Sequence, residues 1–158
     1  MKTVIVSIDT GDPQNSDSTS AIVRMEFNGT DVVRTAMTYT GSFTEKSADI
    51  MNFSQDADLV ILEKIDSTNK YLARSVIKEQ LELLKWFKDC GFETYELIRS
   101  GRKEIITDAL MKKIEMWTEG GHRTHHNDVR DATRNGLYAM AKDENLNKIL
   151  SYYVQHFF

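Results

Sequence analysis

The sequence has one cysteine, one proline and no long apolar run. Its 158 residues include one cysteine, Cys90, which excludes an internal disulfide and a zinc site built from cysteines alone. No apolar run approaches the roughly 20 residues that cross a bilayer. The chain opens without a basic segment followed by an apolar one. We therefore expect a cytoplasmic protein that has no membrane partner.

Proline is equally scarce, and its position is informative. Pro13 is the only proline and lies in the turn-rich segment 12–17. No proline-rich, glycine-rich or low-complexity stretch suggests a linker, and 41% hydrophobic residues are enough for one core. We expect a single domain over residues 1–158.

Net charge is −4, which argues against a nucleic-acid partner, but the charges are unevenly placed. Residues 99–134 hold eight basic and six acidic side chains, a local balance of +2, together with three histidines. On charge alone, solvated helix faces explain this segment as well as a nucleic-acid surface does.

Hydrophobic periodicity and turn residues predict ten elements. Asn28-Gly29-Thr30-Asp31 is a hairpin signal between two strands, and Gly91 marks the end of a long helix. Strands are predicted at 2–9, 20–27, 32–39, 58–63 and 92–98, and helices at 44–53, 70–89, 104–117, 127–141 and 146–157.

Three consecutive strands followed by alternating helices and strands predict the α/β class, with a mixed five-stranded sheet covered by helices on both faces. Ribonuclease H-like folds are built in this way. In an open α/β sheet the functional site lies beyond the strand ends where the topology switches. The first and fourth strands are expected to be neighbours at that point.

Four carboxylates occur where such a fold could bring them together. Asp9 and Glu63 each end an apolar run, and acids are rare on central strands. Asp128 and Asp131 are three residues apart at the start of a predicted helix, hence on one helix face. This arrangement suggests a divalent-metal site. The plain alternative is that the acids cap strands and a helix.

The motifs Ile8-Asp9-Thr10-Gly11, Leu62-Glu63 and Asp128-x-x-Asp131-Ala132 occur in an order and spacing that resemble RuvC-type Holliday junction resolvases. The chain is still more similar to the shorter phage-encoded relatives of these enzymes, and the resemblance spans nearly its whole length. It implies a ribonuclease H-like nuclease acting on four-way and branched DNA, in the host cytoplasm if the protein is phage-encoded.

The resemblance also implies the chemistry. Asp9, Glu63, Asp128 and Asp131 would be catalytic and would hold two Mg²⁺ or Mn²⁺ ions that hydrolyse a phosphodiester. Asp9 would be the bridging ligand. Hard carboxylate oxygens suit these ions, and no organic cofactor is expected.

One departure from the family pattern concerns how the junction is opened. Bacterial members carry an aromatic residue shortly after the strand-four glutamate, where this chain has Lys64-Ile65-Asp66-Ser67. Tyr71 follows later, and we expect it to pack under the next helix.

Basic residues are predicted to bind backbone phosphates. The loop 99–103 stands where bacterial members place a lysine- and glycine-bearing loop. The alternative is a polar turn whose long side chains cover apolar surface. The predicted DNA-binding residues are Arg99, Arg102, Lys103, Lys112, Lys113 and Arg123.

Histidines precede the last acid pair. The spacing of His122, His125 and His126 permits zinc, but no cysteine lies near. His125 and His126 are predicted as accessory residues that orient water or phosphate beside the carboxylates. Solvated loop histidines are the alternative.

The helix predicted at 70–89 is apolar over more of its circumference than one core-facing stripe requires. Part of it should meet another surface, and two opposed cuts in a four-way junction require two sites related by a two-fold axis. We therefore expect a homodimer. The alternative is a monomer in which the C-terminal helix, with Tyr152, Tyr153 and Phe157, covers the extra face.

Other functions remain open at this point. Asp9-Thr10-Gly11 also resembles the phosphate loop of actin-like sugar kinases, but the second such loop that these folds require is absent. Ribonuclease H activity on an RNA–DNA hybrid and a module that binds branched DNA without cutting it are the remaining alternatives.

Overall fold

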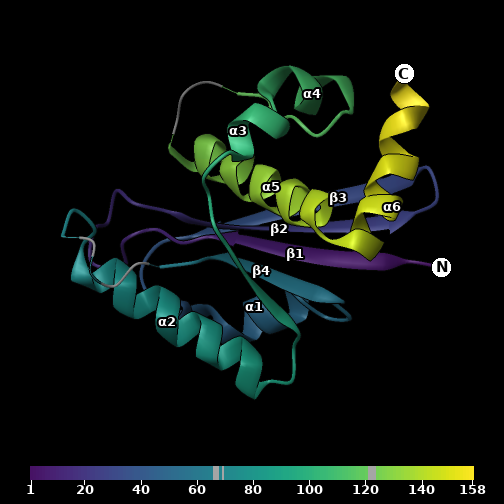
Figure 1. The fold of residues 1–158 in the computed structure, drawn as a ribbon. Helices are drawn as coiled ribbons and strands as arrows, with labels where there is room; N and C mark the ends of the chain where they lie inside the picture. The colour runs from purple at the N-terminus through teal and green to yellow at the C-terminus, as the bar shows by residue number, and fades with distance from the viewer. Residues whose placement is uncertain (66–67, 69, 121–123) are drawn as a thin grey trace.

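The computed structural model describes residues 1–65, 68, 70–120 and 124–158. Its strands and helices follow the predicted order (Figure 1). The strands are β1 Thr3–Asp9, β2 Ser20–Asn28, β3 Asp31–Tyr39, β4 Leu59–Glu63 and β5 Thr94–Leu97. The helices are η1 Phe43–Lys46, α1 Ser47–Phe53, α2 Arg74–Asp89, α3 Arg102–Ile105, α4 Asp108–Lys113, α5 Thr124–Lys142, α6 Glu144–Val154 and η2 Gln155–Phe157.

The five strands form one mixed sheet in the order β3-β2-β1-β4-β5. β1 pairs antiparallel with β2, and β2 antiparallel with β3. β4 joins β1 in parallel, and β5 joins β4 in parallel. The expected mixed five-stranded sheet is confirmed, and so is the expectation that the first and fourth strands are neighbours.

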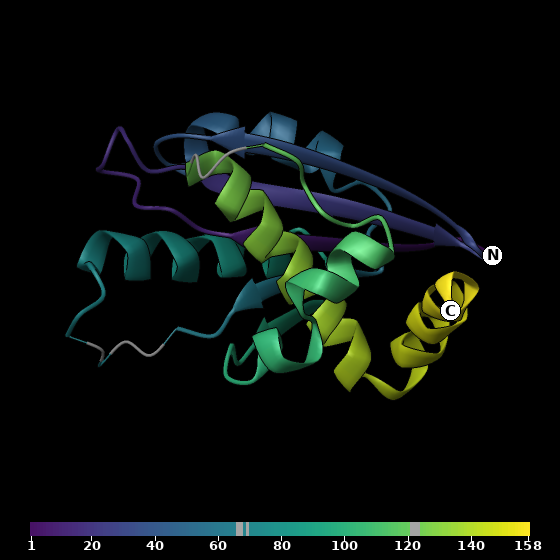
Figure 2. The same ribbon diagram turned by 90° about the horizontal axis from the view of Figure 1, so that it is seen from above.

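Helices cover both faces of the sheet (Figures 1 and 2). α5 runs across one face, with α3, α4 and α6 on its side, while α1 and α2 lie on the opposite face. Because β1 is central, Val4 to Ile8 are all buried, and the strand contributes to both apolar cores. Ile5 belongs to the α5 core, whereas Val6 and Ile8 belong to the α2 core.

Several boundaries differ from those expected. The predicted helix at 104–117 is two short helices, α3 and α4, because Ile106 leaves helical geometry and the Thr107 side chain caps α4 by accepting from the Leu110 amide. α2 begins at Arg74, four residues later than predicted.

In the described part of the chain, no helix is both long and apolar enough to span a bilayer.

Gly136 allows α5 to pack closely on β1. A Cβ atom at this position would lie 2.5 Å from Met25 Cε, at the end of a flexible side chain, and 3.2 Å from Ser7 Cβ on β1, so both neighbours would have to shift. The helix therefore approaches the sheet at the point where a larger residue would push it away. Gly136 therefore contributes to the close packing of α5 on β1.

Candidate active site

Asp9 and Glu63 end two neighbouring parallel strands. The register pairs Ser7 of β1 with Ile61 of β4, so two residues further along each strand Asp9 lies opposite Glu63. Gln80, buried on α2, donates a hydrogen bond to the Glu63 carbonyl and so fixes the end of β4 to that helix.

Asp128 and Asp131 approach the same strand ends from α5. Both are partly buried, on one face of the helix. The Thr19 hydroxyl, just before β2, donates a hydrogen bond of 2.5 Å to Asp128 Oδ2. Asp128 is therefore held by the loop between β1 and β2, and the acids of three segments meet at one end of the sheet.

The pKa of Asp9 is affected by its burial and by the other three acids. Burial raises its pKa well above the ordinary value, and the nearby carboxylates of Glu63, Asp128 and Asp131 raise it further. Burial likewise raises the pKa of Asp128, although the Thr19 hydrogen bond acts in the opposite direction. Asp9 is therefore buried within electrostatic range of the other three acids.

Glu63 and Asp131 have basic and amide partners. Glu63 Oε1 accepts from Asn135 Nδ2 at 2.9 Å and pairs with Arg99 Nε at 3.2 Å. Asp131 Oδ1 lies 3.5 Å from Arg102 Nη2 and 3.7 Å from Arg134 Nη1. Each of these two acids is thus held through one oxygen by protein donors.

Solved structures with the same architecture are known. RuvC from Thermus thermophilus superimposes with a TM-score of 0.62 at 11% sequence identity, covering 98% of this chain and 96% of that chain. The chain has a RuvC-like fold. The T. thermophilus RuvC structure in complex with a Holliday junction substrate gives a TM-score of 0.61 at 14% identity, over the same shares of both chains.

A fowlpox virus resolvase in complex with substrate Holliday junction DNA has a TM-score of 0.47 at 15% identity and covers 98% of each chain. No protein-family model and no curated protein sequence matches the chain. The ribonuclease H-like fold predicted from the sequence is confirmed, because this RuvC-like fold is of that class.

The position of Arg102 differs from the predicted DNA contact. We expected its side chain to reach DNA phosphates, but the residue is 3% exposed and contacts Asp131 and Asn135. The physical reason is that Gly101, with φ of 85°, turns the loop so that α3 begins against α5. The Arg102 guanidinium is therefore part of the acidic site.

The other basic residues are more exposed. Arg99 is half exposed although it pairs with Glu63, and Lys103 is exposed on α3. Lys112 and Lys113 are exposed on α4, where their ammonium groups lie over the rings of Trp117 and Phe158. The predicted residue Arg123 lies outside the described residues.

Two of the three histidines near the acid pair, His125 and His126, are described and precede it on α5. His125 and His126 are partly buried, with ring centroids 4.0 Å apart, and His125 is near enough to Asp128 to lower its pKa slightly against the larger effect of burial. His122 lies outside the described residues. The prediction of an accessory role is therefore consistent with the position of His125.

The donor chemistry suits divalent cations, although the side chains are not gathered around one point. Among the described residues, no three His, Cys, Asp or Glu side chains are arranged to hold a metal ion together. Glu63 and Asp131 instead turn one oxygen toward basic or amide groups. Four hard carboxylates nevertheless fit Mg²⁺ or Mn²⁺, because a cation would offset the repulsion among them that helps to raise the Asp9 pKa.

Sequence reasoning missed three residues of this site. Arg134 and Asn135 follow Asp131 by three and four positions, so helical spacing could have placed them on its face. Thr19 carried no recognisable signal, because only the loop between β1 and β2 brings it to Asp128.

Tyr71 also differs from its prediction. Its side chain was expected to pack under the following helix but is 88% exposed, because it lies before α2 begins at Arg74. It is the first aromatic residue after Glu63 in the sequence.

Proposed function

We propose that this protein is a divalent-metal-dependent endonuclease that resolves Holliday junctions and other branched DNA. The observation that carries the proposal is the convergence of Asp9, Glu63, Asp128 and Asp131 at one end of the sheet in a RuvC-like fold. A fold alone does not define an activity. Four carboxylates near one another, however, have little use in a protein that only binds phosphates.

Asp9, Glu63, Asp128 and Asp131 would hold two Mg²⁺ or Mn²⁺ ions. Such ions supply activation of water and stabilisation of the departing oxygen during in-line displacement at phosphorus. Asp9 interacts electrostatically with each of the other three acids and is the proposed shared ligand. Thr19 orients Asp128, while Arg99 and Asn135 orient Glu63.

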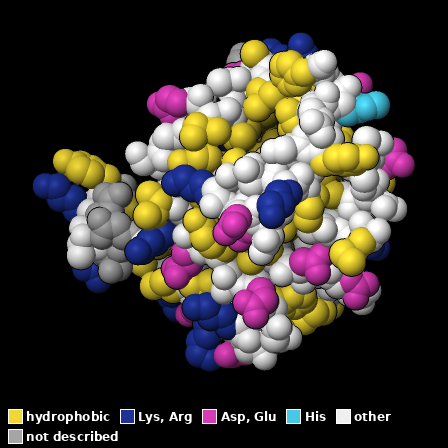
Figure 3. Space-filling view, turned by 45° about the vertical axis from the view of Figure 1, so that its right-hand side comes forward, with side chains coloured by type: hydrophobic (Ala, Val, Ile, Leu, Met, Phe, Trp, Pro, Cys, Tyr) yellow, Lys and Arg dark blue, Asp and Glu magenta, His cyan; other side chains and the backbone are white. Residues whose placement is uncertain are grey.

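Branched DNA would approach over the exposed basic residues Arg99, which pairs with Glu63, and Lys103, which is exposed on the neighbouring helix α3. Their contacts would be to phosphates and would not depend on sequence. Figure 3 shows acidic and basic side chains interspersed over one face of the molecule, so the net charge of −4 does not form a single acidic surface there.

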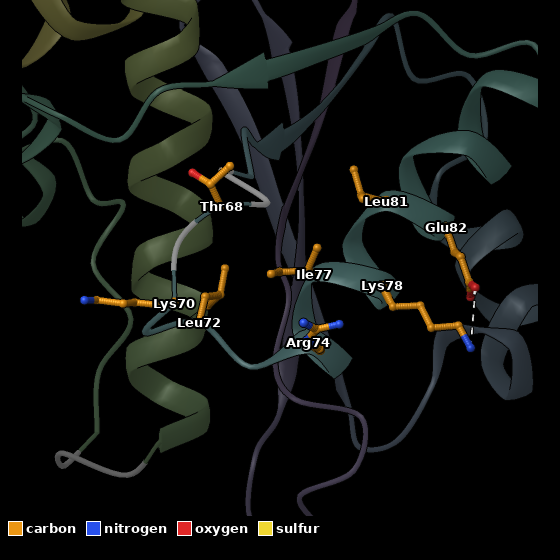
Figure 4. Close-up of a pocket in the computed structure, with 8 residues that line it drawn as sticks. All are labelled: Thr68, Lys70, Leu72, Arg74, Ile77, Lys78, Leu81 and Glu82. Atoms are coloured by element: carbon orange, nitrogen blue, oxygen red, sulfur yellow. Dashed lines mark ion pairs between the residues drawn. The ribbon is translucent and has the colours of Figure 1, made fainter.

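The proposed homodimer would use the side of α2 that faces away from the sheet. Leu83 is fully buried, whereas Leu81 is 45% exposed, so the surplus apolar edge is the one carrying Ile77 and Leu81. This edge lines a groove of about 740 Å³. Figure 4 draws the residues that line it. The groove is lined by Thr68, Lys70, Leu72, Arg74, Ile77, Lys78, Leu81 and Glu82.

The alternative cover for this edge is contradicted by the structure. The C-terminal helix was the candidate in a monomer, but Tyr153 of α6 packs on Phe27 with a centroid distance of 5.9 Å and donates to the Ile114 carbonyl. α6 therefore belongs to the core on the α5 face, opposite α2. A second copy of the chain remains the proposed occupant.

One assay tests the proposal. Purified protein is incubated with labelled four-way junction, duplex, flap and RNA–DNA hybrid, each with Mg²⁺, Mn²⁺ or EDTA. Paired symmetric cuts in the junction, dependent on metal, are the expected result. Cleavage of the hybrid alone would identify a ribonuclease H, and metal-independent binding without cleavage would identify a DNA-binding module.

A further inference from the structure

Two buried polar side chains, Arg102 and Asn135, lie behind the acids and contact each other. Arg102 is 3% exposed and Asn135 is 1% exposed. Burial of a guanidinium is costly unless it is paired and hydrogen-bonded, and burial lowers the pKa of Arg102 while Asp131 and Glu63 oppose that shift. The contacts of this pair therefore explain why it is buried here.

Two hydrogen bonds connect Arg102 to Glu63 through Asn135, and both run from donor to acceptor in the same direction. Arg102 Nη1 donates to Asn135 Oδ1 at 2.6 Å. Because a guanidinium only donates, the amide oxygen must face it, and the Asn135 amide nitrogen is left to face the opposite way. That nitrogen donates to Glu63 Oε1 at 2.9 Å. The charge on Arg102 thus fixes the amide orientation that Glu63 requires.

The same guanidinium reaches the second acid. Arg102 Nη2 lies 3.5 Å from Asp131 Oδ1, and Nη1 lies 3.5 Å from the Asp131 carbonyl. Arg102 therefore connects the acid at the end of β4, through Asn135, to the acid on α5. In both acids the oxygen engaged by the network is a single named atom, Glu63 Oε1 and Asp131 Oδ1.

We propose that Arg102 and Asn135 form a positioning relay that holds Glu63 and Asp131 in a fixed mutual orientation, so that each presents its other oxygen to a divalent cation. The inference rests on the metal site of the proposed function. Partners that hold metal ligands from behind affect metal affinity or activity by roughly 10-fold to 100-fold when they are removed. Arg102 would then position metal ligands, although its place in the basic loop 99–103 suggests DNA binding.

Burial separates this role from a DNA contact. Arg99 and Lys103 of the same segment are exposed and can meet a phosphate, whereas Arg102 donates to groups inside the protein. Lysine could not replace Arg102, because one ammonium lacks the planar fork that reaches Asn135 and Asp131 together.

The test measures Mn²⁺ binding directly, by isothermal titration calorimetry of the metal-free protein. Asn135→Leu keeps the size of the side chain and removes both hydrogen bonds, and Arg102→Lys keeps the charge and removes the fork. Both variants are expected to bind Mn²⁺ about 10-fold to 100-fold more weakly, with junction affinity in EDTA within about twofold of wild type. Raising the Mn²⁺ concentration should restore much of the cleavage rate, because the ligands themselves are intact.

Arg34→Met is the matched control. Arg34 is a partly buried arginine that donates to the Thr118 and Thr133 hydroxyls at 2.8 and 3.1 Å and touches none of the four acids. Its loss should lower the melting temperature while leaving Mn²⁺ affinity unchanged. If Asn135→Leu does not fold, as judged by circular dichroism, Arg102→Lys decides the question by the same titration.

Specific results would overturn the relay. Folded Asn135→Leu or Arg102→Lys protein with wild-type Mn²⁺ affinity would do so, as would wild-type protein that binds no Mn²⁺. Weakened junction binding and a flatter salt dependence in Arg102→Lys, without a change in Mn²⁺ affinity, would return Arg102 to the DNA surface. Wild type that binds Mn²⁺ but cuts no junction, with both variants binding Mn²⁺ weakly, would retain the relay and reject the proposed function.

Discussion

Asp9 and Glu63 lie opposite each other because β1 and β4 are parallel, adjacent and in register. Two acids at the exits of central strands repel each other, and the structure places Asp128 and Asp131 near them as well. A fold does not maintain such repulsion for packing alone, so the arrangement points to a ligand that carries positive charge.

The first prediction concerns cleavage. Asp9→Asn should reduce junction cleavage on the order of 10³-fold or more, because metal ions supply several kcal/mol of charge stabilisation and about 1.4 kcal/mol is tenfold in rate. Junction binding should be kept or improved, since the substitution removes one negative charge that faces the phosphates. Single-turnover cleavage and filter binding measure the two effects.

A matched control exists for this substitution. Asp143 caps α6 by accepting from the Asn145 and Leu146 amides, and an asparagine side chain can accept the same bonds. Asp143→Asn should therefore cut normally. Asp108 is a poorer control because it pairs with Arg134, which also contacts Asp131. Full cutting by Asp9→Asn would remove the metal-site assignment.

The second prediction concerns pH and stability without metal. The folded-state pKa of Asp9 is raised above its ordinary value, so its neutral form favours folding at low pH, and that contribution is lost as pH rises through the folded-state pKa. In EDTA at about pH 7.5, Asp9→Asn should raise the melting temperature by roughly a few degrees. The gain should disappear below about pH 4. Equal gains at both pH values would show that charge is not the cause.

The third prediction concerns affinity for DNA. Arg99→Ala and Lys103→Ala should each weaken junction binding and reduce the log–log salt slope by roughly one unit for each phosphate that the variant no longer neutralises. Arg99→Ala should also disturb cleavage, since it pairs with Glu63, whereas Lys103→Ala should affect binding alone. An unchanged slope in both variants would place the DNA elsewhere, with Lys112 and Lys113 the next residues to test.

The fourth prediction concerns assembly. Leu81→Glu should give a folded monomer that binds junctions weakly and fails to cut them symmetrically, because Leu81 is exposed on the proposed dimer surface. Leu83→Glu should unfold, since an unpaired charge in the core costs several kcal/mol or more. Sedimentation with circular dichroism measures both. Wild type that sediments as a monomer at micromolar concentration, even with junction bound, would contradict the dimer.

Local sequence was enough to predict the five strands, the order of the elements along the chain and the fold class. Alternation and apolar runs predict the strands, and the Asn28-Gly29 turn predicts the hairpin, because both depend on neighbours close in the chain. The acids at the ends of β1 and β4 could be identified for the same reason. Boundaries failed where a cap intervened, as at Thr107, which divides α3 from α4.

Only the tertiary structure decided the contacts across the molecule. Whether Arg102 faces DNA or Asp131, whether Leu81 or Leu83 is exposed, and whether Thr19 reaches Asp128 all depend on elements distant in sequence. Periodicity states that a residue is polar or apolar, but burial and hydrogen-bond partners arise from packing. The sequence by itself therefore determined which acids could converge, and the packing of α5 on β1 and β4 decided what holds them there.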